Sequence, residues 1–112
     1  MRALLALVAV TALAGCSSRA EKQLEAVKSV RSILAEWALV EAQASKGRSP
    51  QTYADEMRQD SKDELEKAAK DLAGQPGAAQ LVAKLRAGSP DSAALKQAAD
   101  RLEPLEKSLE AA

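Results

Sequence analysis

The apolar positions of the chain follow a helical period in four segments, which are separated by short stretches rich in glycine, proline and serine. These stretches lie at 46–50, 74–77 and 88–90. In each, glycine follows a periodic run and proline comes shortly before the next one, as expected where one helix stops and another starts. The segments between are rich in Ala, Leu, Glu, Lys and Gln, which favour helix, and none alternates like a half-buried strand. The pattern therefore predicts an all-α protein.

The first two segments predict two long amphipathic helices, over about residues 19–46 and 50–73. Ser18 fits a capping box at the first start, because Glu21 follows it three residues later. A short loop between two long helices predicts an antiparallel hairpin. The apolar arc of the first helix recurs at about 100° per residue and holds Leu24, Val27, Val30, Ile33, Leu34, Trp37, Ala38 and Val40.

Two shorter segments complete the predicted fold. The third helix is expected over about residues 77–87, and the fourth starts at Pro90. Ser49 and Ser89 each precede a proline and are the expected N-caps. Pro104 removes a backbone donor within the fourth segment, which predicts a kink or two shorter helices. Covering the hairpin with these elements gives a small antiparallel helical bundle, with two long helices, one short helix and one Pro-kinked helix.

The first sixteen residues have a different pattern, typical of a secretory signal. Arg2 precedes an apolar run over 3–13 that is broken only by Thr11. This run is too short for a spanning helix, which needs roughly 20 residues, but it fits the apolar region of a signal peptide. It leads into Leu13-Ala14-Gly15-Cys16. These four residues resemble the lipobox of bacterial prolipoproteins, which has an aliphatic residue, two small residues and a cysteine.

The resemblance implies that Cys16 carries lipid. In that family a diacylglyceryl group joins the thiol, the signal peptide (here 1–15) is cut off between Gly15 and Cys16, and the new amino group is often acylated, so palmitate is an expected modification. Two or more acyl chains give stable anchoring where one does not. Two alternatives stay open. One is an ordinary signal peptide cut before Gly15, because Ala12 and Ala14 satisfy the small-x-small rule; the other is a signal-anchor.

The resemblance also predicts a location. Residues 16–18 leave a very short tether before the helical domain, 19–112, so this domain should sit close to the bilayer. In Gram-negative lipoproteins Asp directly after the lipidated cysteine usually implies retention at the inner membrane, whereas this chain has Ser17. We therefore expect a lipid-anchored protein of the bacterial cell envelope. If the source is Gram-negative, the resemblance favours the periplasmic face of the outer membrane.

The composition argues against several kinds of chemistry. The 16 basic and 16 acidic residues balance, and no basic patch with interleaved aromatics is evident, so we expect no nucleic acid as a partner. The chain has no histidine and one cysteine, which excludes His-based catalytic triads, a disulfide within the chain and a Cys-based zinc site. We therefore expect no catalytic residue, no metal, no cofactor and no enzyme activity.

Two residues of the first helix are candidate partner contacts. Trp37 lies in the middle of the apolar arc, where it is either a core anchor or a contact for a ligand or partner. Glu41 falls inside the same arc near the end of the helix. It either marks the point where the helix leaves the core, pairs with a basic residue such as Arg48, or faces a polar partner.

These patterns predict a membrane-anchored envelope lipoprotein whose helical domain binds, scaffolds or regulates another component without catalysing a reaction. Large apolar side chains are few, so each helix contact buries little area. We therefore expect an envelope protein partner or self-association, besides the membrane contact through lipid on Cys16. The alternative function is a periplasmic carrier of lipid or another hydrophobic ligand, held in a groove between the Ala-rich helices.

Overall fold

The computed structural model describes the backbone of residues 2–111 and the side chains of residues 19–111. Within that part of the chain every regular element is helical, which confirms the predicted all-α class. The predicted lipidation site at Cys16 and the cleavage site beside Gly15 lie outside the described side chains and stay predictions. The elements are α1 (Arg2–Ser45), α2 (Gln51–Ala69), the 3₁₀ helix η1 (Lys70–Leu72), α3 (Pro76–Ala87) and α4 (Ser92–Ala111).

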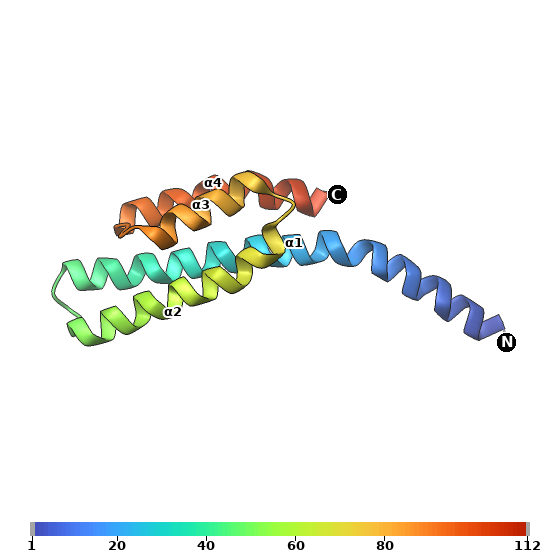
Figure 1. Ribbon diagram of the computed structural model, residues 1–112, viewed down its shortest axis with the longest axis horizontal. Helices are drawn as coiled ribbons and strands as arrows, with labels where there is room; N and C mark the ends of the chain where they lie inside the picture. The colour runs from blue at the N-terminus through green and yellow to red at the C-terminus, as the bar shows by residue number, and fades with distance from the viewer. Residues whose placement is uncertain (1, 112) are drawn as a thin grey trace.

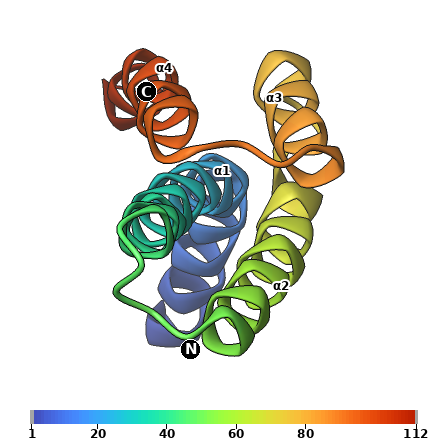
Figure 2. The same cartoon turned by 90° about the vertical axis from the view of Figure 1, so that its left-hand side faces the viewer.

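The helices form an antiparallel bundle in which each runs opposite to the one before it (Figure 1). Viewed along the bundle, α1 packs against α2 and α4, and α3 lies between α2 and α4 on the other side (Figure 2). The interface between α1 and α4 is the most extensive, and the one between α3 and α4 is the smallest that joins two α-helices. The predicted hairpin, covered by the third and fourth helices, is confirmed.

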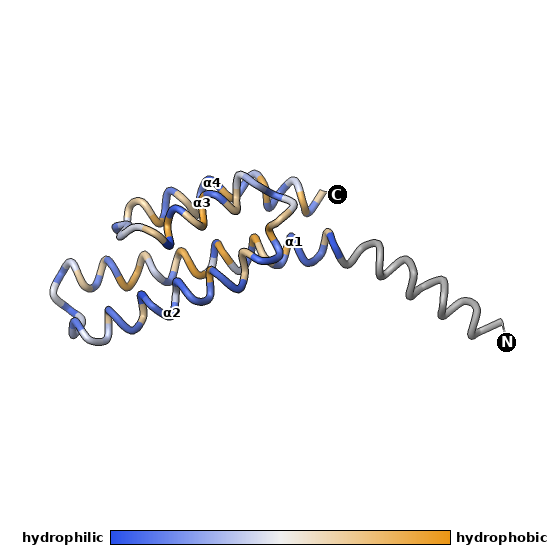
Figure 3. The backbone as a smooth tube through the Cα atoms, in the orientation of Figure 1, coloured by the Kyte–Doolittle hydropathy of each residue, from blue (hydrophilic) through white to orange (hydrophobic). Residues whose placement is uncertain are grey.

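The core follows the apolar arc of α1. Trp37 is 1% exposed, and fully or almost fully buried leucines and valines from the other elements surround the arc. Among the described side chains, no buried nitrogen or oxygen lacks a hydrogen-bond partner. α2 is largely hydrophilic (Figure 3) and buries only Ala54, Ser61 and Leu65. The buried members of this core are Ala26, Val27, Val30, Leu34, Trp37, Ala38, Leu65, Leu72, Ala78, Val82, Leu85, Leu95, Ala98 and Leu102.

The ends of the first two helices differ from the predictions. In the uncleaved chain α1 passes through 16–18 and ends at Ser45, so its predicted start at Arg19 is wrong. Pro50, rather than Ser49, occupies the N-cap position of α2, and its carbonyl accepts the first helical hydrogen bond from the amide of Ala54. The predicted end of α2 is also wrong, because its last turn tightens into η1, as helix ends often do.

The predicted cap of the fourth helix is also corrected. The carboxylate of Asp91 accepts a 2.8 Å hydrogen bond from the amide of Ala94, so Asp91 is the N-cap and Ser89 is not. One helix then runs through Pro104, which excludes two separate helices. Asp100, whose carbonyl loses its helical donor, is exposed, so water can satisfy it.

Candidate functional site

The two candidate residues lie toward the end of the bundle that holds the loops 46–50 and 88–91. We call this the distal end, because the described side chains of α1 begin at the opposite end (Figure 1). We call that opposite end the basal end; it contains the part of α1 where the described side chains begin, together with η1 and the turn into α3. Distal and basal ends are therefore separated by most of the length of α2.

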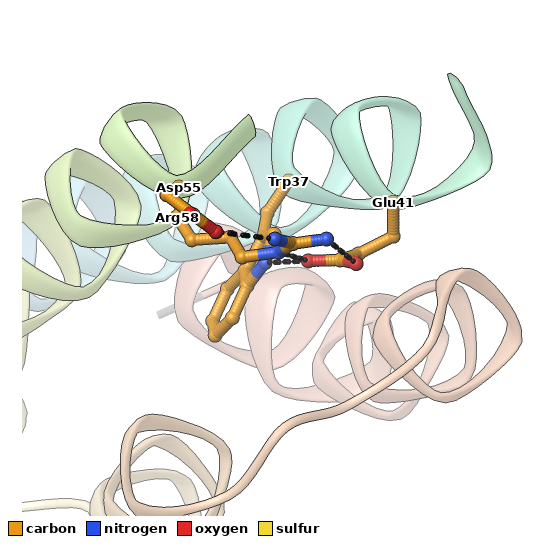
Figure 4. A network of polar contacts seen from close by, with 4 residues as sticks. All are labelled: Trp37, Glu41, Asp55 and Arg58. Atoms are coloured by element: carbon orange, nitrogen blue, oxygen red, sulfur yellow. Dashed lines mark hydrogen bonds and ion pairs between the residues drawn. The ribbon is translucent and has the colours of Figure 1, made fainter. Parts of the chain in front are cut away.

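A chain of polar contacts joins α1 to α2 at the distal end (Figure 4). The indole N–H of Trp37 donates a 2.9 Å hydrogen bond to Oε2 of Glu41, one turn further along α1. Arg58 of α2 donates to both carboxylate oxygens of Glu41, from Nε at 2.6 Å and from Nη2 at 2.9 Å. Its remaining nitrogen, Nη1, donates to Asp55 at 2.8 Å. Arg58 is thus held in a bidentate pair, the strongest geometry for an arginine and a carboxylate.

The surroundings keep Glu41 ionised. Its side chain is 16% exposed and that of Arg58 is 32% exposed. The hydrogen bonds from Arg58 lower the pKa of Glu41 below its ordinary value of 4.5, although burial opposes the shift. The same pairing raises the pKa of Arg58. A general acid or base needs a pKa near the working pH, so this carboxylate suits a fixed ion pair rather than proton transfer.

The arrangement answers the question that the sequence left open about Glu41. Its basic partner is Arg58, rather than Arg48, and the pair ties the two helices of the hairpin together. Sequence reasoning missed Arg58 and its neighbour Asp55. The sequence does show that Asp55 and Arg58 are three residues apart and so share one face of α2. No local sequence pattern shows that this face meets Glu41.

Trp37 is enclosed by the same arrangement. Its ring lies in the core with 1% exposure, and its polar edge is taken by Glu41. A hollow of about 310 Å³ opens beside this edge, between the network and the α3–α4 loop. An external partner can therefore meet the polar atoms of Glu41 and Arg58 here, whereas the indole ring itself is accessible only if the bundle opens. The hollow is lined by Trp37, Glu41, Asp55, Arg58, Lys62, Gly88, Ser89 and Pro90.

Two further findings concern metals and membranes. In residues 19–111, no three side chains of the types that ligate metals come together in one place. None of the helices combines, over its described residues, the length and the apolar character that crossing a bilayer requires.

Comparisons with protein-family models, curated proteins and solved structures give no significant match for this chain.

Proposed function

We propose that this protein is a bacterial envelope lipoprotein whose helical bundle acts by binding another envelope component, without catalysing a reaction. The observation that carries the proposal is Leu13-Ala14-Gly15-Cys16, placed directly after a short apolar run. A lipid on Cys16 would hold the protein on the membrane, and the outer membrane is favoured if the source is Gram-negative.

The fold supports the binding role. The hydrogen bonds from Arg58 hold the carboxylate of Glu41 in the charged form, which suits fixed structure and not turnover. Trp37 is enclosed; among the described side chains, the exposed large apolar ones that a partner can reach are Leu39 on α1, 62% exposed, and Tyr53 on α2, 51% exposed.

Metabolic labelling with a clickable palmitate analogue tests the anchor. The full-length protein, expressed in a bacterium, is expected to take up the label, and Cys16→Ser is expected to lose it because the thiol is the first acceptor. Ser17→Ala is the matched control and should keep the label, since the neighbouring residue accepts no lipid. Equal labelling of Cys16→Ser and the original chain, or no labelling of either, would contradict the proposal.

One observation favours the alternative function, a carrier of hydrophobic ligands. α3 and α4 are the least closely packed neighbours in the bundle, and a hollow of about 340 Å³ lies between them. Its walls include the apolar side chains of Leu81, Leu85 and Ala98, with Lys84 and Arg101 as its charged residues. Native mass spectrometry of protein purified from cells distinguishes the functions, since a carrier should retain a lipid in a one-to-one complex and a binding module should not.

A further inference from the structure

The basal end carries a basic hollow that the sequence does not reveal. Arg19 and Lys22 of α1 line one side, and Lys70 of η1 lines the other, with Asp71 as the acidic residue in the lining. The volume is about 560 Å³. We call it the basal hollow; the complete lining is Arg19, Lys22, Gln23, Lys70, Asp71, Ala73 and Gly74.

The three cations of the basal hollow are exposed. Among the described side chains, Arg19, Lys22 and Lys70 take part in no ion pair. With Asp71 counted, the lining carries a formal charge of +3 − 1 = +2. Glu21, two positions after Arg19, points about 200° away from Arg19 around the helix and is not part of the lining.

Close packing fixes the position of Lys70. Leu72 at the end of η1 is fully buried in the core, which holds the adjoining turn against α1. The approach is tight, because a Cβ built on Gly74 would lie 2.6 Å from Nε2 of Gln23. Lys70, which is far from Arg19 and Lys22 in the sequence, is thereby placed beside the turn of α1 that carries them. The three cations therefore line one hollow.

We propose that the basal hollow binds the phosphate groups of anionic phospholipids in the membrane that anchors the protein. This inference rests on the proposed function, since it takes Cys16 as the anchored residue. Only Ser17 and Ser18 lie between Cys16 and Arg19, so the Cα atoms of Cys16 and Arg19 are three steps apart and lie within about 11 Å of each other whatever the local conformation. The basic side chains are thus held at the level of the headgroups, where anionic lipid attracts Lys and Arg. Such a contact directs the distal end away from the bilayer.

Vesicle co-sedimentation of the unlipidated mature chain (residues 16–112 carrying Cys16→Ser) tests the contact at low ionic strength, where screening is weak. Vesicles of phosphatidylcholine alone are compared with vesicles that also contain phosphatidylglycerol. The chain is expected to bind the anionic vesicles preferentially. The combined variant Arg19→Gln, Lys22→Gln and Lys70→Gln should bind them roughly 100-fold less, at about fivefold per basic residue.

The matched control removes one arginine and two lysines elsewhere, as Lys46→Gln, Arg48→Gln and Lys96→Gln. These residues are also exposed and lie outside the basal hollow. Circular dichroism checks that both variants keep their helix content. The control is expected to retain most of the affinity for anionic vesicles.

Three results overturn the proposal: equal loss in both variants, equal binding to both kinds of vesicle, or no vesicle binding by the original chain, which would leave the hollow to an acidic protein partner. The assay uses a chain without lipid, so its outcome is independent of palmitate labelling. Failure of the headgroup contact is therefore distinguishable from failure of the anchor.

Discussion

The charged clusters described at the two ends of the bundle differ in how their residues are paired. At the distal end Arg58 donates hydrogen bonds to Glu41 and Asp55. The pair of Arg58 and Glu41 joins α2 to α1. At the basal end Arg19 and Lys70 lie beside a common hollow and form no ion pair within the described part of the chain.

Burial explains the difference. A carboxylate that is largely removed from water, like that of Glu41, must find its partner within the protein, since an unpaired buried charge is costly. The exposed cations of the basal hollow have no such requirement and stay available to another surface. The pair of Glu41 and Arg58 therefore supports the structure. The cations of the basal hollow, in contrast, can bind an external anion.

Among the substitutions considered, the largest loss of folding stability is expected from a change in the core near the distal end. Trp37→Ala removes a fully enclosed aromatic ring and is expected to lower the free energy of unfolding by about 4 kcal/mol. Urea unfolding followed by circular dichroism measures this loss. Leu39→Ala is the control on the same helix, and because Leu39 is exposed its effect should stay within about 0.5 kcal/mol. Equal effects of the two substitutions would show that Trp37 is not a core residue.

A smaller loss is expected when the ion pair is broken. Arg58→Gln leaves the carboxylate of Glu41 without its bidentate partner and should cost about 2 kcal/mol in urea unfolding, as for hydrogen bonds to charged groups. Lys107→Gln is the control, because it breaks an exposed i,i+4 pair with Glu103 and should cost less than about 0.5 kcal/mol. If both variants lose the same amount, the distal network contributes no more than a surface pair.

The pH dependence of stability gives the finest test of the distal network. The pKa of Glu41 is lower in the folded protein than its ordinary value of 4.5. The ionised carboxylate therefore stabilises the fold above that value, and the contribution is lost as the pH falls through the folded pKa. Urea unfolding from neutral pH down to about pH 3 should show a smaller acid-induced loss in Glu41→Gln than in the original chain. Parallel curves would contradict the role given to Glu41.

The sequence was sufficient for the architecture because a helical period and its interruptions are local signals. The apolar arc through Val27, Leu34 and Trp37 identified the buried face of α1. The three stretches rich in glycine, proline and serine marked the boundaries between the helices. The caps were less predictable. Ser49 and Asp91 are both good N-cap residues, and only the path of the chain decides that Asp91 caps its helix while Ser49 does not.

The partners of charged residues could not be predicted for a different reason. The pairing of Glu41 with Arg58 depends on the rotation of α2 about its axis, and α2 buries few apolar side chains that would reveal it. The placement of Lys70 and Arg19 beside one hollow depends on how η1 packs against α1. Both arrangements bring together residues from different helices, so no local pattern contains them.

We propose that lipid on Cys16 holds the bundle at the membrane. Mass spectrometry of the N-terminal peptide, from protein extracted from bacterial membranes, tests this anchor without an intermediate assumption. We expect a peptide that begins at Cys16 and carries the added mass of a diacylglyceryl group, with or without a further acyl chain on the amino group. An unacylated peptide that begins at Gly15 or still retains Arg2 would contradict it.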